Sequence, residues 1–109
     1  MTTAVDTGLT QLGATGLTSD AERQRYAEIS RALADPKRLC VLEILASGEH
    51  SVGDLSREAS CHVPNMSQHL AVLRSAGLVI SRREGNTVFY RLTDARILEA
   101  YRLIQSVAR

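Results

Sequence analysis

The spacing of apolar residues along the chain predicts five helices and one pair of strands. Helices are expected over residues 19–33, 35–47, 51–59, 63–75 and 94–108. The first and last of them each carry an apolar stripe at helical spacing (Tyr26, Ile29, Leu33; Ile97, Tyr101, Ile104). Two β-prone segments, residues 79–83 and 88–92, flank a turn that contains Gly85-Asn86, which predicts a β-hairpin.

Capping residues place the helix boundaries. Ser19-Asp20-Ala21-Glu22 has the spacing of a capping box, and Asp35-Pro36 is an N-cap followed by a proline in the first turn. Pro64 and Gly77 bracket the fourth helix, and Thr93 or Asp94 is expected to cap the last one. The order of elements predicts a mainly α fold with a small hairpin, the winged helix-turn-helix, whose second helix enters the major groove of DNA.

Composition fits a single globular domain in a chain of 109 residues, with 44% hydrophobic and 23% charged residues. Residues 1–18 are rich in Thr and Gly and are expected to form a flexible tail, or a helix that orders on a partner, ahead of a folded domain over 19–109. No apolar run approaches the ~20 residues of a membrane span, and no secretory signal is visible, so we expect a cytoplasmic protein. Cys40 and Cys61 are then expected to be reduced thiols.

The distribution of charge is more informative than the net charge of +1. Residues 57–91 contain five arginines (57, 74, 82, 83 and 91) but only two acidic residues, Glu58 and Glu84. Most other acidic residues lie outside this stretch. The chain is therefore expected to present one cationic face despite its near-neutral total.

The fourth helix carries the candidate DNA-reading face. At 100° per residue, Met66, Leu70 and Leu73 share the inner side, and the outer side bears short polar groups and one arginine (Pro64, Asn65, Ser67, Gln68, Arg74). Asn and Gln can pair with adenine edges, and Ser with several bases or a phosphate. The alternative for such a face is simple solvation.

The hairpin supplies the second group of candidate contacts. Arg82 and Arg83 precede its turn, and Asn86 and Thr87 lie in or after it. Arginine there can bind phosphate or enter a narrow minor groove, although charges on a strand edge also prevent unwanted pairing. The alternation does not decide which arginine points outward. Lys37 and Arg38 are further candidates for phosphate contact, with surface solubility as the alternative.

Several motifs resemble the signatures of the ArsR/SmtB family of bacterial repressors. The resemblance covers about residues 23–104, and its specific part runs from Ser67 to Leu92 (Asp35-Pro36-Lys37-Arg38-Leu39, Ser51-Val52-Gly53-Asp54-Leu55, Ser67-Gln68-His69-Leu70-Ala71-Val72-Leu73-Arg74, Ala76-Gly77-Leu78-Val79, and residues 83–92). It implies a homodimer, joined through the first and last helices, that binds a palindromic operator and leaves it when an inducer arrives. Residues 62–65 depart from the family pattern, so the operator sequence does not transfer.

The family's usual sensor sites are missing from this sequence. Ser51 and Gly53 stand where relatives carry the two cysteines of the thiolate metal site. In the zinc-type site Asp94 is kept, but Arg96 and Val107 replace histidines, and the sequence ends before the fourth ligand. The effector is thus left open between a transition-metal ion or a thiol-reactive signal at a non-standard site, and none.

The remaining sensor candidates are cysteines and histidines. Cys61, His62 and His50 are the metal candidates, and the pair Cys61-His62 is singled out because it precedes the fourth helix. Cys40 and Cys61 are the redox candidates, and a disulfide between them needs Cα atoms within ~7 Å. The alternative for both thiols is simple apolar packing. His69 is expected to be a packed residue at the edge of the core.

Enzymatic motifs are not found. The sequence shows no Gly-rich phosphate loop, no Ser-His-Asp order and no paired acids, so we expect no enzyme. The rival hypothesis is a winged-helix module that binds proteins and not DNA. The arginine hairpin and the Ser67/Gln68 face distinguish the two, since only DNA binding requires them.

Overall fold

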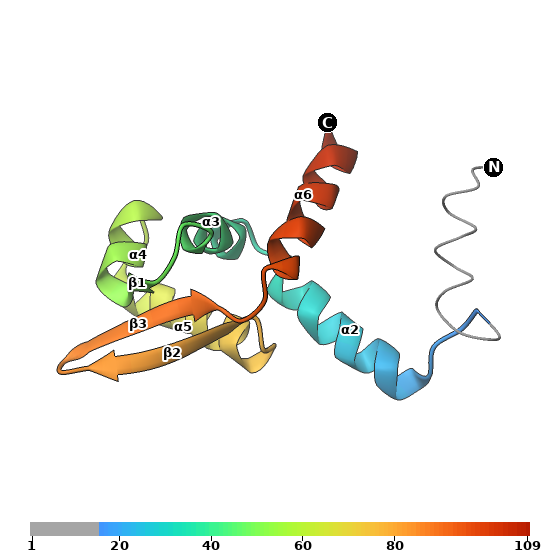
Figure 1. Ribbon diagram of the computed structural model, residues 1–109, viewed down its shortest axis with the longest axis horizontal. Helices are drawn as coiled ribbons and strands as arrows, with labels where there is room; N and C mark the ends of the chain where they lie inside the picture. The colour runs from blue at the N-terminus through green and yellow to red at the C-terminus, as the bar shows by residue number, and fades with distance from the viewer. Residues whose placement is uncertain (1–15) are drawn as a thin grey trace.

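The computed structural model describes residues 16–109, and the expected tail over 1–18 therefore lies mostly outside the described residues. The described elements are α2 (Asp20–Ala32), α3 (Pro36–Leu45), β1 (His50–Ser51), α4 (Val52–Glu58), α5 (Val63–Ser75), β2 (Val79–Glu84), β3 (Thr87–Leu92) and α6 (Arg96–Ala108). In Figure 1 α3, α4, α5 and the sheet form one body, from which α2 and α6 extend. The predicted winged helix-turn-helix is confirmed.

The helix starts follow the predicted capping chemistry. The Ser19 hydroxyl accepts from the Glu22 N–H at 3.1 Å, and the Glu22 carboxylate accepts from the Ser19 N–H at 2.7 Å. Asp35 accepts from the N–H groups of Lys37 and Arg38, at 2.8 and 3.1 Å. Burial disfavours the charged form of Asp35, but these N–H groups outweigh it and lower the pKa of its carboxyl.

The start of α6 corrects one expectation. Its N-cap is Ala95, neither Thr93 nor Asp94, and no side chain caps it in the usual way. The Asp94 carboxylate instead accepts from both the side chain and the backbone N–H of Arg96, and these bonds lower the pKa of Asp94 to about 2. Thr93 is used elsewhere: its hydroxyl donates to the Gly77 carbonyl at 2.7 Å.

The sheet has one strand more than the hairpin that the sequence predicts. Strand β1 consists of two residues and pairs antiparallel with β3, with His50 opposite Tyr90 and Ser51 opposite Phe89, so the order is β1-β3-β2. The hairpin itself follows the prediction, with Val79 opposite Leu92 and Arg83 opposite Val88. The sequence does not predict β1, because two residues are too few to show an alternation of apolar and polar side chains.

The core lies where α3, α4 and α5 meet the sheet. Its fully buried side chains are aliphatic residues of these three helices (Val41, Leu42, Leu55, Met66, Leu70, Leu73). Burial of each such side chain stabilises the fold by about 1.5–3 kcal/mol before entropy is counted. The core therefore fixes α5, with its outer side free.

Candidate nucleic-acid interface

Helix α5 presents a polar face that no part of the described chain covers. Met66, Leu70 and Leu73 are fully buried beneath it, as the helical spacing predicts. The candidate contact residues of this helix are all exposed (Pro64, Asn65, Ser67, Gln68, Arg74). Within residues 16–109 none of these side chains makes a hydrogen bond or ion pair, so their donors and acceptors are available to a partner.

The turn before α5 sets the helix-turn-helix geometry. Ser60 adopts φ of 52°, and the Cys61 N–H donates to the Ser56 carbonyl at 2.9 Å, which ends α4 sharply. The Lys37 ammonium donates a hydrogen bond to the carbonyl of Ala59, the C-cap of α4. Lys37 thus stabilises the end of a helix, a third possibility beside phosphate contact and solubility.

The two arginines of the hairpin have different environments. The Arg82 guanidinium binds the Glu49 carboxylate, with Nη2 2.7 Å from Oε1, and also lies 3.2 Å from Glu84. Its Cζ lies 4.6 Å from the centre of the Phe89 ring. Hydrogen bonds to Glu49 and Glu84 raise the pKa of Arg82, and the same contact lowers the pKa of Glu49.

Arg83, by contrast, is exposed and has no polar partner among residues 16–109. Asn86 and Thr87 lie beside the hairpin turn and are exposed as well, with side chains that make no hydrogen bond in the described part of the chain. The hairpin tip therefore offers one unpaired guanidinium and two small polar groups. Glu49, which anchors Arg82, lies 33 residues away in the sequence and was not identified as part of this site.

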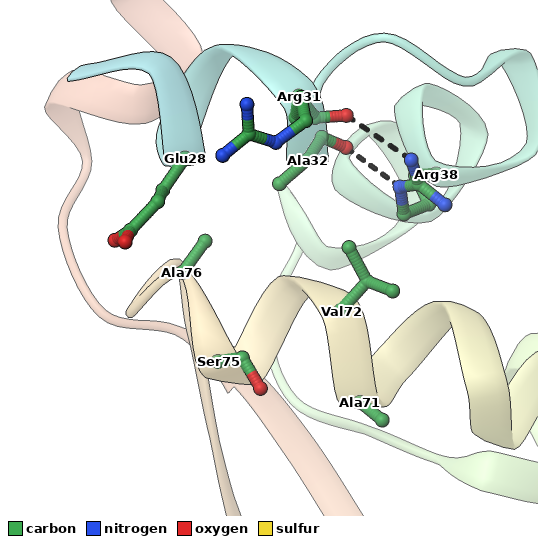
Figure 2. A pocket seen from close by; sticks show the side chains of 8 residues that line it. All are labelled: Glu28, Arg31, Ala32, Arg38, Ala71, Val72, Ser75 and Ala76. Atoms are coloured by element: carbon green, nitrogen blue, oxygen red, sulfur yellow. Dashed lines mark hydrogen bonds between the residues drawn. The ribbon is translucent and has the colours of Figure 1, made fainter. Parts of the chain in front are cut away.

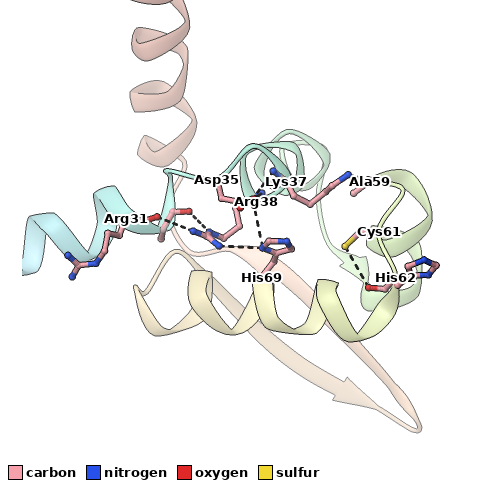
Figure 3. Close-up of polar contacts among 9 residues, drawn as sticks. Arg31, Asp35, Lys37, Arg38, Ala59, Cys61, His62 and His69 are labelled. Atoms are coloured by element: carbon pink, nitrogen blue, oxygen red, sulfur yellow. Dashed lines mark hydrogen bonds and ion pairs between the residues drawn. The ribbon is translucent and has the colours of Figure 1, made fainter.

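Arg38 is the centre of a polar cluster next to α5. Its guanidinium donates to the carbonyls of Ala32 and Arg31, at 2.8 and 3.1 Å, and lies 3.3 Å from Nδ1 of His69 (Figure 3). His69 is half-buried, as expected, and its Nδ1 is 3.9 Å from the Asp35 carboxylate. Arg38 therefore caps α2 and contacts α5, so its guanidinium is already engaged within the protein.

The candidate metal ligands His50 and Cys61 each contact different groups. His50 lies on β1, with Nδ1 2.9 Å from the Gly48 carbonyl and Nε2 3.7 Å from Glu58. The Cys61 thiol lies 3.6 Å from the His62 carbonyl, and the His62 side chain is exposed (Figure 3). Among residues 16–109 no three His, Cys, Asp or Glu side chains form a group that could hold a metal ion. Cys40 and Cys61 are free, partly buried thiols that pack against the core.

Comparison with known proteins agrees with this geometry. A family model described as "Bacterial regulatory protein, arsR family" matches residues 35–81. The chain is 43% identical over 86 residues to the biofilm growth-associated repressor of Agrobacterium fabrum, covering 73% of this chain and 74% of the relative.

Two solved structures from Mycobacterium bovis have the same fold. The crystal structure of a possible transcriptional regulatory protein fragment matches with a TM-score of 0.78 and 33% identity, over 84% of this chain and 98% of that one. The solution structure of a homodimeric winged helix-turn-helix DNA-binding domain, a possible ArsR-family regulator, matches with a TM-score of 0.75 and 34% identity, over 84% and 87%.

The fold and these comparisons define a winged helix-turn-helix DNA-binding transcriptional regulator. The chain belongs to the arsR family of bacterial regulatory proteins. This membership disfavours the rival protein-binding module. Among residues 16–109 no helix is long and apolar enough to cross a membrane.

Proposed function

We propose that the chain is a cytoplasmic, homodimeric repressor that places one α5 in each half of a palindromic operator. The observation that carries this proposal is the exposed, unpartnered polar face of α5 beside the unpaired guanidinium of Arg83. Short amide and hydroxyl side chains suit base edges, and an unpaired guanidinium suits phosphate. DNA contact is therefore expected from the candidate residues of the two elements, with Arg82 as the support of Arg83 (Pro64, Asn65, Ser67, Gln68, Arg74, Arg83, Asn86, Thr87).

The dimer is supported by the apolar side of α6. Leu103, Ile104 and Val107 are 68%, 50% and 84% exposed, and Tyr26 on α2 is 49% exposed. Such a surface is costly in water and typical of a subunit interface. Both helices extend from the body in Figure 1, which leaves them accessible to a second copy. A homodimer also matches the two-fold symmetry of a palindromic site.

The proposal is tested by binding to DNA over a salt series. Wild-type protein is used to enrich a duplex from a random pool, and the affinity for that duplex is measured by fluorescence anisotropy between 50 and 200 mM salt. We expect a palindromic duplex, two protomers per duplex, and an affinity that falls steeply with salt because phosphate contacts release counterions. Failure to enrich any duplex, with no salt dependence, would contradict the proposal.

For the inducer we propose a thiol-reactive compound or a transition-metal ion that acts at Cys61. Its thiol is only two residues before the start of α5, so a group bound there would displace the N-terminal end of that helix. Release of labelled duplex is titrated with Ni²⁺, Zn²⁺, arsenite and an oxidant, for wild type and Cys61→Ser. Release of wild type alone supports Cys61, and equal release of both proteins contradicts it. Cys40→Ser is the matched control for the second thiol.

A further inference from the structure

Helix α2 is joined to α5 at the end of the recognition helix. Arg25, in the middle of α2, donates from Nη2 to the carbonyl of Ala76 at 3.0 Å. Ala76 is buried and is the C-cap of α5, so this bond satisfies a carbonyl at the helix end. The residue after it, Gly77, has φ of +81°, and a Cβ there would lie 3.1 Å from the same guanidinium nitrogen. Glycine at 77 therefore permits both the turn and the close approach of Arg25.

A second arginine, Arg38 of α3, contacts the same two helices about two turns away from Arg25. Arg38 binds the last carbonyls of α2, those of Arg31 and Ala32, and reaches Nδ1 of His69 in the middle of α5 (Figure 3). The two arginines together connect α2 to the centre and to the C-terminal end of α5. We call Arg25 and Arg38 the arginine tethers.

Between the tethers the two helices are not in close contact. A groove of about 650 Å³ separates them, with Glu28 and Arg31 on the α2 side and Ala71, Val72 and Ser75 on the α5 side (Figure 2). Ala32 is the only buried residue of α2. Interdigitated side chains normally fix the angle between two helices, and here that packing is confined to the end of α2. Ile29 and Leu33 pack against the core at this same end, so the angle between α2 and α5 depends on that short apolar contact together with the tethers.

We propose that Arg25 and Arg38 are positioning residues that set the placement of α5 relative to the dimer, and hence the operator half-site spacing that the protein accepts. This inference rests on the proposed function, because α2 is taken as part of the subunit interface. In a dimer, the two α5 helices must enter grooves one helical turn apart, about 34 Å. A rotation of α5 about α2 would change that distance without altering any residue that contacts a base.

The test compares three duplexes. The first is the palindrome enriched by wild-type protein, the second carries two additional base pairs at its centre, and the third contains a single half-site. Arg25→Gln removes the tether, and Arg25→Lys keeps a cation that can donate to Ala76. Arg23→Gln is the matched control, because Arg23 also lies on α2 but bonds only to Thr18 and Asp20 within residues 16–109.

For Arg25→Gln we expect at least a fivefold loss of affinity for the palindrome, with half-site affinity within twofold of wild type. Its preference for the palindrome over the lengthened duplex should fall by the same factor. Arg25→Lys should recover a large part of that preference, Arg23→Gln should leave it unchanged, and Arg38→Gln should reproduce the effect of Arg25→Gln.

Equal losses on all three duplexes would overturn the inference, because a misfolded protein or a lost phosphate contact weakens the half-site as well. An unchanged preference in both Arg25→Gln and Arg38→Gln would also overturn it. The proposed function fails by a different observation, namely wild-type protein that enriches no duplex. The two failures are therefore distinguishable.

Discussion

The guanidinium of Arg82 donates two hydrogen bonds to the carboxylate of Glu49, with Nε 2.9 Å from Oε2 and Nη2 2.7 Å from Oε1. This two-point contact joins β2 to the residue just before β1, across 33 positions of sequence. The neighbouring Arg83 has no polar partner among residues 16–109. The two arginines, adjacent in sequence, therefore have separate roles: one holds the hairpin and the other is available to DNA.

Replacement of Arg83 by Ala is expected to weaken binding to all duplexes to a similar degree. Each protomer of the proposed dimer then loses one phosphate contact, so the slope of log affinity against log salt should fall by about 1.8, or about 0.9 for each contact. Anisotropy titrations between 50 and 200 mM salt measure that slope. Arg102→Ala, which removes an exposed arginine of α6, is the control. An unchanged slope for Arg83→Ala would contradict the assignment of Arg83 to phosphate.

Acidification is expected to loosen the hairpin through Glu49. Hydrogen bonding to Arg82 lowers the pKa of Glu49 below its ordinary value of 4.5, so the folded state favours the charged carboxylate. The resulting stabilisation is fully present above the unfolded pKa, near 4.5, and is lost as the pH falls through the lower folded value.

Amide exchange at Phe89, measured from pH 6 down to pH 3 and corrected for intrinsic rates, follows this change. Protection should decrease below pH 4.5 in wild type, since Arg82 then loses the charge of Glu49, the nearer of its two carboxylate partners. In Glu49→Gln it should already be reduced at pH 6 and should vary less with pH. The same pH dependence in both proteins would exclude Glu49 as the cause.

The proposed function makes Gln68 and Ser67, which are exposed on α5, the residues that read bases. Gln68→Ala should lower the preference for the enriched palindrome over random DNA by about 1–3 kcal/mol for each half-site if Gln68 pairs with an adenine. Binding to random DNA should change little, because the phosphate contacts remain. Competition titrations against both duplexes give the ratio. Equal losses on the two would show that Gln68 does not read bases.

Truncation of a buried side chain of α5 should destabilise the domain without altering the exposed face of that helix. Leu70 is fully buried, so Leu70→Ala should destabilise the domain by about 2–5 kcal/mol through lost burial and a cavity. Val72, 40% exposed on the same helix, is the control, and Val72→Ala should cost far less. Urea unfolding monitored by circular dichroism gives both values, and similar midpoints for the two variants would refute this reading of the core.

A carboxylate on the apolar side of α6 should separate the subunits. Val107→Glu places a charge among side chains that the proposed dimer buries, whereas Arg102→Glu places the same charge on another side of the helix. Light scattering after size exclusion should give a monomer for the first variant and a dimer for the second. A dimeric Val107→Glu protein would remove this face from the interface.

The sequence predicts α5 closely because its signals are local. Pro64 at the first turn, Gly77 after the end and three inner apolar residues suffice to give the bounds and the buried side. The separate roles of Arg82 and Arg83 were not predictable, because the partner Glu49 is distant in sequence. The bond from Arg25 to Ala76 spans 51 positions and ends on a backbone carbonyl, for which no residue type is diagnostic.

Strand β1 links the hairpin directly to the first helix of the helix-turn-helix, α4. Ser51 pairs with Phe89 of β3, and its hydroxyl accepts from the Asp54 N–H at 3.1 Å to begin α4. A single residue thus ends one element and starts the next, with no linker between them. The hairpin and α4 should consequently unfold locally as one cooperative unit. Contact of the hairpin tip with the DNA backbone would then also displace the N-terminal end of α4.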